Sequence, residues 1–291
     1  MDVIQRFVFD ELDARGAIVR LQESCEAIQA THHYPPPLAT LLNQFAVAAC
    51  LLRDSLKVKA AVTIQLRASG AIALIMADCS ANNKVRAIAE YDLEQLPVGE
   101  FLDLRSVAGN AVMAITISPV EGERYQGIVP IEHPALAACL EDYFQRSEQL
   151  PTWFSLLADQ SQAVGMSIHA LPSEKVKNRE EADEHFLRLQ TLLKSMTPGE
   201  ALQLDNQATL TRLFHEESCR LFSPSTVEFG CECSREKSLA AIISLGKEDA
   251  EQLIAEQQHE GLIAFKVDCH FCFQRYEIPH AQVSQAFEKR Q

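Results

Sequence analysis

Apolar residues at helical spacing predict two buried helices within the first 170 or so residues. Behind the prolines at 35–37, residues 38–56 form a long and mostly apolar run, which is typical of a helix inside a core. A second helix is expected after Pro134, a residue favoured in a first helical turn. Its apolar residues recur at steps of three and four: Leu136, Cys139, Leu140, Tyr143 and Phe144.

The same region carries strand patterns. Val62, Ile64 and Leu66 alternate with polar residues, as in a strand with one buried face, and Ser69-Gly70 then predicts a turn. The apolar segment 71–77 would complete a hairpin. Further strands are expected, between turn residues, at 84–91, 112–117, 125–131 and 164–170. This mixed order predicts an α+β fold with antiparallel-rich sheets and packed helices.

A change of composition marks the end of that domain. Residues 173–184 are rich in charge and poor in apolar side chains. A helical stripe then follows, stopped by Thr197-Pro198-Gly199, and a further helix is indicated around 210–214. The stripe consists of Phe186, Leu189, Leu192, Leu193 and Met196. It either packs on a neighbouring domain or forms a regulated surface, and the pattern alone leaves both open.

We therefore predict three parts: an N-terminal α+β domain at 1–178, a helical linker at 179–228 and a small C-terminal domain at 229–291. The chain has 291 residues, 47% of them hydrophobic and 23% charged, as in an ordinary soluble globular protein. No signal-peptide core or membrane-length apolar run is present, so we expect a cytoplasmic protein with no membrane partner. The net charge of −14 and the lack of a basic run argue against a nucleic-acid partner.

Nine cysteines in a chain without an export signal indicate metal binding or redox chemistry rather than a disulfide framework. Four of them form two close pairs separated by 35 residues, Cys231-Glu232-Cys233 and Cys269-His270-Phe271-Cys272. This spacing predicts one zinc ion held by four thiolates. A closed set of four sulfurs leaves no position for water, so a hydrolytic zinc enzyme is not expected.

The segment between the pairs fits a metal-dependent fold. Short helices are expected at 239–245 and 249–255, around Gly246, with little core of their own. Structural zinc supplies roughly 10 to 16 kcal/mol in small peptides, which is enough to hold such a domain folded. Strand-like segments at 262–267 and 273–278 flank the CxxC, as in a zinc hairpin rather than a thioredoxin-type redox centre. The zinc could be a staple alone, or its thiolates could react with oxidants.

Several motifs together resemble those of the heat-shock protein 33 family of bacterial redox-regulated chaperones, over essentially the whole chain. Besides the CxC and CxxC pairs they are Arg6-Phe7-Val8-Phe9, Asp13-Ala14-Arg15-Gly16, Gly122-Glu123-Arg124-Tyr125-Gln126-Gly127-Ile128-Val129, Cys139-Leu140-Glu141-Asp142-Tyr143-Phe144, Ser147-Glu148-Gln149-Leu150-Pro151 and Phe229-Gly230.

The resemblance implies a stress-response holdase that uses no ATP and is not an enzyme. Its reduced, zinc-bound form would be inactive. Oxidation would pair Cys269 with Cys272, weaken zinc binding, and then pair Cys231 with Cys233 as the linker unfolds. Exposed apolar surface would bind unfolding client proteins, and the activated form would be a homodimer. The order-to-disorder step agrees with a linker of low stability.

Two other functions are weighed against this one. A zinc-dependent adaptor for nucleic acid or protein would have no redox switch, and an oxidoreductase would use Cys269 and Cys272 with turnover. His270 is expected to be a solvated loop residue, because four sulfurs already satisfy zinc. Cysteines within apolar runs are expected to be small buried hydrophobes, whereas Cys219 could form stray disulfides once the linker unfolds. The five cysteines without an assigned role are Cys25, Cys50, Cys79, Cys139 and Cys219.

Overall fold

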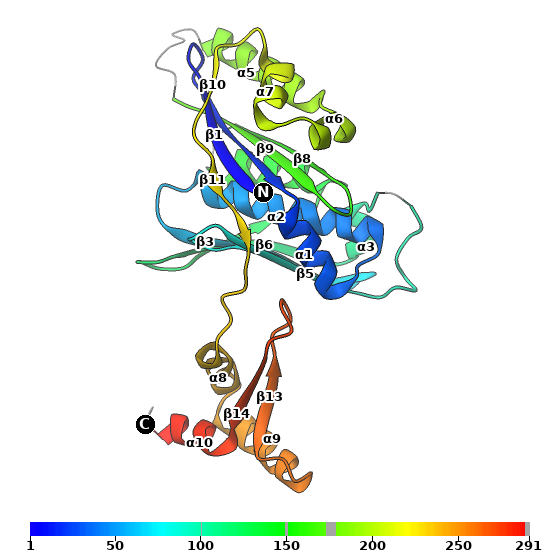
Figure 1. The fold of residues 1–291 in the computed structure, drawn as a ribbon, viewed down its shortest axis with the longest axis vertical. Helices are drawn as coiled ribbons and strands as arrows, with labels where there is room; N and C mark the ends of the chain where they lie inside the picture. The colour runs from blue at the N-terminus through cyan, green and yellow to red at the C-terminus, as the bar shows by residue number, and fades with distance from the viewer. Residues whose placement is uncertain (100, 149–150, 173–178, 289–291) are drawn as a thin grey trace. The chain divides into compact units, whose positions relative to one another are not determined.

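The computed structural model of the protein describes residues 1–99, 101–148, 151–172 and 179–288 (Figure 1). The chain divides into two compact units, Met1–Gly230 and Cys231–Gln291. Residues 173–178, where the predicted linker boundary falls, lie outside the described residues.

The first unit contains two six-stranded sheets. The first sheet is antiparallel and has the order β10-β1-β2-β9-β8, with β11 also pairing with β1. Its strands are β1 (Val3–Phe9), β2 (Ala14–Leu21), β8 (Thr152–Ala158), β9 (Ala163–Ala170), β10 (Cys219–Leu221) and β11 (Ser225–Thr226). The strands β10 and β11 return to β1 from more than 200 residues along the chain, so the end of the predicted linker is bound to the first strand.

The second sheet has the order β12-β5-β4-β3-β6-β7, antiparallel except for the parallel pair β12 and β5. The predicted hairpin is confirmed, since Val62 pairs with Cys79 and Arg67 with Leu74 across β3 and β4. The strands are β3 (Ala60–Ala68), β4 (Ile72–Cys79), β5 (Lys84–Tyr91), β6 (Ala111–Pro119), β7 (Tyr125–Val129) and β12 (Glu228–Phe229).

The helix α2 (Pro36–Ser55) lies between the two sheets (Figure 1) and contacts strands of both. Its prolines lie in the first turn, where a missing N–H costs nothing, and the predicted buried helix is confirmed. Phe45 and Leu42 on α2 are fully buried in the large core that joins the sheets. Shorter helices lie around this core: α1 (Glu23–His32), α3 (Leu104–Ala108) and α4 (Leu136–Tyr143), which continues into a π-helical turn, η1 (Phe144–Glu148).

The helices of the predicted linker cover the face of the first sheet that points away from α2. They are α5 (Arg179–Lys194), α6 (Pro198–Gln203) and α7 (Asn206–Phe214), and they form a second core with that face. Leu189, Leu193 and Met196 of the predicted stripe are buried there. Thr197-Pro198-Gly199 ends α5 as expected and also begins α6, because Thr197 and Glu200 form a capping box.

The second unit is a small α+β arrangement. The predicted helices are present as α8 (Arg235–Ser244) and α9 (Lys247–His259), and the predicted hairpin as β13 (Ala264–Asp268) and β14 (Arg275–Pro279). A helix that the pattern did not predict, α10 (His280–Glu288), follows β14. The core of this unit consists of Ile242, Ala250, Phe265, Ile278 and Val283. The two units together confirm the predicted α+β class.

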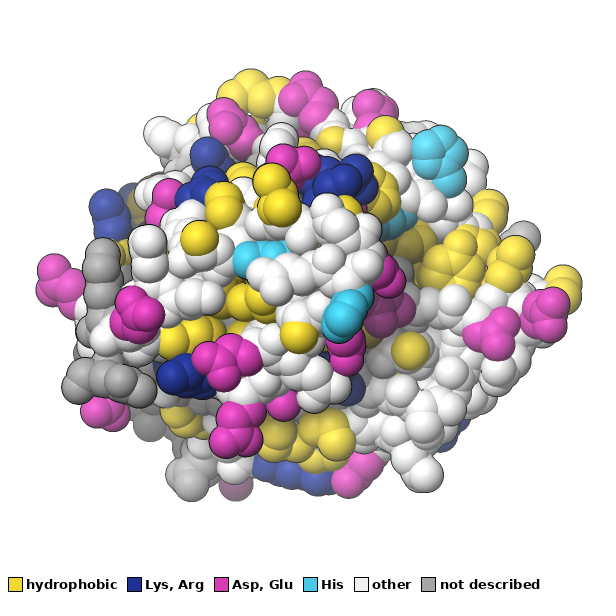
Figure 2. All heavy atoms as spheres, turned by 90° about the horizontal axis from the view of Figure 1, so that it is seen from below, with side chains coloured by type: hydrophobic (Ala, Val, Ile, Leu, Met, Phe, Trp, Pro, Cys, Tyr) yellow, Lys and Arg dark blue, Asp and Glu magenta, His cyan; other side chains and the backbone are white. Residues whose placement is uncertain are grey.

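The surface and the helices bear on the expectation that the protein binds neither nucleic acid nor a membrane. On the face that Figure 2 shows, lysine and arginine side chains of the described residues lie scattered among acidic and hydrophobic ones. Within the described part of the chain, no helix combines the length and the apolar character needed to cross a membrane.

Candidate metal centre

The four predicted ligands lie on two loops of the second unit. Cys231 and Cys233 occupy the extended stretch before α8, where residues two apart point to the same side of the chain. Cys269 and Cys272 occupy the turn between β13 and β14. This turn is closed by hydrogen bonds from the Phe273 N–H to the Cys269 carbonyl, 2.8 Å, and from the Cys269 N–H to the Gln274 carbonyl, 2.9 Å.

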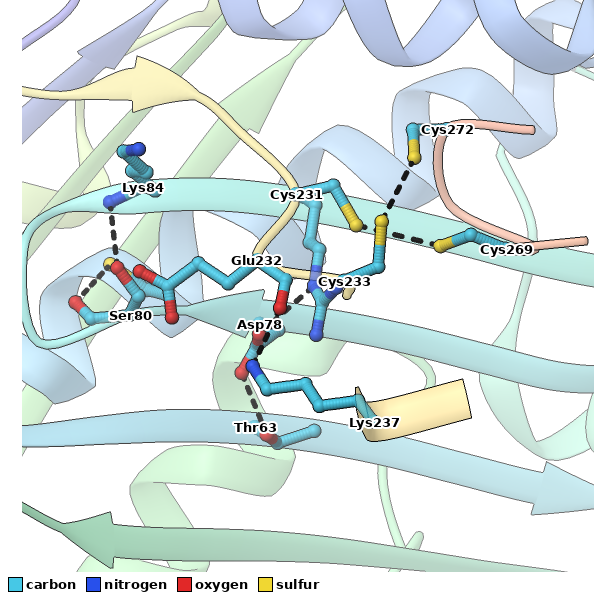
Figure 3. A network of polar contacts seen from close by, with 12 residues as sticks. Thr63, Asp78, Ser80, Lys84, Cys231, Glu232, Cys233, Lys237, Cys269 and Cys272 are labelled. Atoms are coloured by element: carbon cyan, nitrogen blue, oxygen red, sulfur yellow. Dashed lines mark hydrogen bonds and ion pairs between the residues drawn. The ribbon is translucent and has the colours of Figure 1, made fainter. Parts of the chain in front are cut away.

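The structure brings all four sulfurs together. The four Sγ atoms lie within 4.8 Å of one another, and all four residues are partly exposed. Each contact of 3.5 Å joins one cysteine of the CxC to one of the CxxC, Cys231 to Cys269 and Cys233 to Cys272 (Figure 3). His270 is exposed and is not a member of the cluster.

Hydrogen bonds hold the CxC loop against the start of α8. Ser234 is the N-cap and accepts from the Lys237 N–H at 3.2 Å, a contact that satisfies one of the free N–H groups of the first turn. The Lys237 ammonium reaches back to donate to the Glu232 carbonyl at 2.6 Å (Figure 3). Both contacts fix the residues on either side of Cys233, so its sulfur has a defined direction.

The geometry of the cluster fits a tetrahedral zinc ion. With Zn–S bonds of 2.3 Å, the sulfurs of a regular tetrahedron lie about 3.8 Å apart, close to the two 3.5 Å contacts. Burial, together with hydrogen bonding to the neighbouring thiols, raises the pKa of Cys272 to about 12, and burial also raises that of Cys269. Four thiolates at this spacing therefore need a cation among them. A soft thiolate set suits zinc better than magnesium or calcium.

The cluster has one polar neighbour that the sequence reasoning missed. The Tyr276 hydroxyl lies 3.0 Å from the Cys233 Sγ atom. Tyr276 belongs to β14, where it pairs with Val267 of β13. Only the register of the hairpin places it beside the sulfurs. The one signal available beforehand was an aromatic residue four positions after the last cysteine of the CxxC.

The remaining cysteines belong to the first unit. Cys25, Cys50, Cys79 and Cys139 are buried, as predicted for cysteines in apolar runs, and Cys219 is half-buried. Burial raises the pKa of the Cys25 thiol far above its ordinary value, and it raises that of Cys219 to about 12. Since the thiolate is the reactive form, burial lowers the reactivity of these two thiols at neutral pH.

Comparison with known proteins gives concordant matches over the chain. A family model described as "Hsp33 protein" matches residues 2–279. The 33 kDa chaperonin of Ectopseudomonas mendocina is 44% identical over 98% of this chain and 95% of its own length. That of Azotobacter vinelandii is 43% identical over 98% and 94%. The crystal structure of a 33 kDa chaperonin from Thermotoga maritima has a similar fold, with a TM-score of 0.76 at 21% identity, covering 99% of this chain and 98% of its own.

Proposed function

Because the chain belongs to the Hsp33 family of chaperones, we propose that it is an ATP-independent holdase that oxidation switches on. The observation that carries the proposal is the cluster of four cysteines in a unit whose described residues include only six buried hydrophobic side chains. Such a unit depends on its metal, so chemistry at the sulfurs controls its folding. The holdase binds unfolding client proteins and catalyses no reaction.

In the reduced form, Cys231, Cys233, Cys269 and Cys272 hold one zinc ion. An oxidant such as hydrogen peroxide converts a thiolate to a sulfenic acid and releases hydroxide. The second thiolate of the pair then attacks that sulfur, which forms the disulfide and releases a second hydroxide. By analogy with the family, Cys269 and Cys272 pair first, zinc leaves, and Cys231 then pairs with Cys233.

The linker is the second part of the proposed switch. We retain the division into a chaperone domain at 1–178, a metastable linker at 179–228 and a redox domain at 229–291. The α5–α7 helices cover an apolar sheet face that includes Phe7, Phe9, Ile18, Met166 and Ile168. When these helices detach, that face becomes available to exposed apolar segments of a client, and a second activated chain can dimerise with the first.

A few polar contacts add to the apolar packing of the cover. Arg20 on β2 donates to the Ala201 carbonyl at 2.9 Å and to the Asn206 side chain at 3.2 Å. Lys194 on α5 pairs with Glu141 at 3.1 Å, with the lysine half exposed. Partly exposed contacts of this kind contribute little each, so the buried apolar side chains supply most of the free energy that holds the cover in place.

The test compares zinc-loaded reduced protein with peroxide-treated protein at a mildly unfolding temperature. Zinc release is followed with a coloured chelator, and chaperone activity as suppression of a client's aggregation. We expect one zinc per chain to be released and suppression to appear only after oxidation. Equal suppression of aggregation by both forms would contradict the proposed redox switch. Salt-sensitive binding to nucleic acid would favour the adaptor function instead.

A companion variant tests the ligand set. C269S/C272S removes two of the four sulfurs and should abolish tight zinc binding, whereas C25S removes a buried thiol of the first unit and should leave it at one ion per chain. Tight binding of one zinc by C269S/C272S would show that the assignment of four ligands is wrong.

Dimerisation is measured by light scattering after gel filtration of the oxidised protein, which should elute as a dimer.

A further inference from the structure

One side chain outside the four cysteines is in position to change their reactivity. Tyr276 is half-buried, and its ring packs against the small core of the second unit. Its backbone is held by the β13–β14 pairing, opposite Val267. With ring and backbone both held, the hydroxyl is directed at the Cys233 sulfur, 3.0 Å away.

The direction of this hydrogen bond follows from the chemistry of the site. A metal-bound cysteine is a thiolate and has no proton to give, so the phenol O–H donates and the sulfur accepts. Charge-assisted hydrogen bonds of this kind are about twice as strong as those between neutral groups. The bond draws electron density from the sulfur and restricts its motion.

The cysteines of the CxxC have a different environment. Both lie in the turn between β13 and β14, which is held by backbone hydrogen bonds from the Phe273 N–H to the Cys269 carbonyl and from the Cys269 N–H to the Gln274 carbonyl. These bonds belong to the turn itself. Cys233 receives its donor from a side chain on another element, and this donor stays in place only while the β13–β14 hairpin is folded.

We propose that Tyr276 is a positioning residue that holds Cys233 in the cluster and lowers its nucleophilicity until the hairpin opens. The sulfur lone pair that would attack the O–O bond of peroxide is shared with the phenol proton, so sulfenic acid formation at Cys233 is slowed. The pair Cys269 and Cys272 then closes first, and Cys233 becomes reactive once the hairpin has lost its metal. This inference rests on the proposed four-thiolate zinc site.

The test is the Y276F variant, which keeps the ring and its packing and removes only the donor. Zinc-loaded protein is treated briefly with N-ethylmaleimide, and labelling at each cysteine is quantified by peptide mass spectrometry. We expect labelling of Cys233 to rise about tenfold relative to Cys272 in the same molecules, the scale on which groups around metal ligands act. Y125F, which removes an exposed hydroxyl of the first unit, is the matched control and should leave this ratio unchanged.

The readout separates a positioning role from a structural one. Loosening of the whole unit raises labelling at all four cysteines alike, and either that result or an unchanged Cys233 ratio overturns the proposal. A second readout is the thiolate-to-cobalt charge-transfer band of Co²⁺-loaded protein, which should shift in Y276F and stay fixed in Y125F. Failure of the wild-type protein itself to bind one zinc per chain would instead contradict the proposed function.

Discussion

In the first unit, α2 packs between two six-stranded sheets, and the hydrophobic core continues through both. In its described residues the second unit has three helices and one hairpin, with six buried hydrophobic side chains. Apolar burial contributes about 25 cal/mol per Å², and a unit of some 60 residues with so few buried side chains cannot offset its loss of chain entropy by burial alone. Under the proposed function, the chain joins a part that folds by apolar burial to a part that folds by metal coordination.

The thiols follow the same division. In the first unit, Cys25, Cys50, Cys79 and Cys139 are buried, and buried structural cysteines are inert. In the second unit, four partly exposed sulfurs lie together, open to solvent and to oxidants. Under the proposed function, oxidation therefore acts on the second unit and leaves the large core of the first unit in place.

The largest expected effect is that of metal removal. A strong chelator under reducing conditions should unfold the second unit and leave the first folded, since structural zinc contributes roughly 10 to 16 kcal/mol in small domains. The measurement is two-dimensional NMR of the full chain before and after chelation. Signals of 231–288 should collapse to unfolded positions while those of α2 and β3 persist. A second unit that stays folded without metal would contradict the comparison.

A smaller effect is expected where the linker covers the first sheet. Leu189 on α5 is fully buried, so Leu189→Ala should weaken the cover by about 2 to 5 kcal/mol. The protein's one tryptophan reports on this, because Trp153 stacks on Phe186 of α5 with ring centroids 5.9 Å apart. Its fluorescence should shift to the red at a lower temperature in the variant.

The same helix offers the control. Leu187 is 59% exposed, so Leu187→Ala should leave both the fluorescence transition and the activity of the reduced protein unchanged. Leu189→Ala should raise client binding by the reduced, zinc-bound form. If the two variants behave alike, the α5 cover does not restrain the chaperone.

Acid should weaken the first unit through His169. Burial, helped by the nearby Arg15, lowers the pKa of His169 from 6.5 to about 4. Between these two pH values the unfolded chain binds a proton at His169 that the folded chain does not. The free energy of unfolding is therefore highest above pH 6.5 and falls as the pH is lowered toward 4. The difference between the two pKa values corresponds to a loss of roughly 3 kcal/mol in the free energy of unfolding.

Urea unfolding of the first unit's signals between pH 6.5 and 4 measures this slope. The His169→Gln variant, which can keep a polar contact with Thr152, should flatten it, whereas His215→Gln, at a side chain 67% exposed, should not. An unchanged slope in His169→Gln would assign the acid sensitivity to other groups.

The smallest effect concerns a single helix cap in the linker. The Asp205 carboxylate accepts from the Ala208 N–H at 2.7 Å and begins α7. Asp205→Ala should cost about 1 kcal/mol, and Asp205→Asn, which keeps a side-chain oxygen acceptor, should cost less. The measurement is the midpoint of the Trp153 fluorescence transition, which is expected to fall modestly and in that order.

Long periodic segments and close cysteine spacing could be interpreted from the sequence. The α2 helix and the β3–β4 hairpin follow from hydrophobic period and turn residues, and the cluster follows from the CxC and CxxC spacing. The β2 strand was missed, because it is buried on both faces and lacks alternation. The α1 helix was missed because it is largely polar and begins on the distant Asp2, whose carboxylate accepts from three N–H groups. The position of Tyr276 beside Cys233 depends on the register of the β13–β14 hairpin, which no local sequence pattern encodes.

The central claim is that oxidation unfolds the second unit and the linker and leaves the large core intact. Hydrogen–deuterium exchange of the full chain, read by mass spectrometry before and after peroxide at a mildly unfolding temperature, tests it most directly. The account predicts loss of protection in 231–288 and in α5–α7, with α2, β3 and β4 still protected. Client binding by oxidised protein in which α5–α7 remain fully protected, or in which α2 has also lost protection, would contradict it.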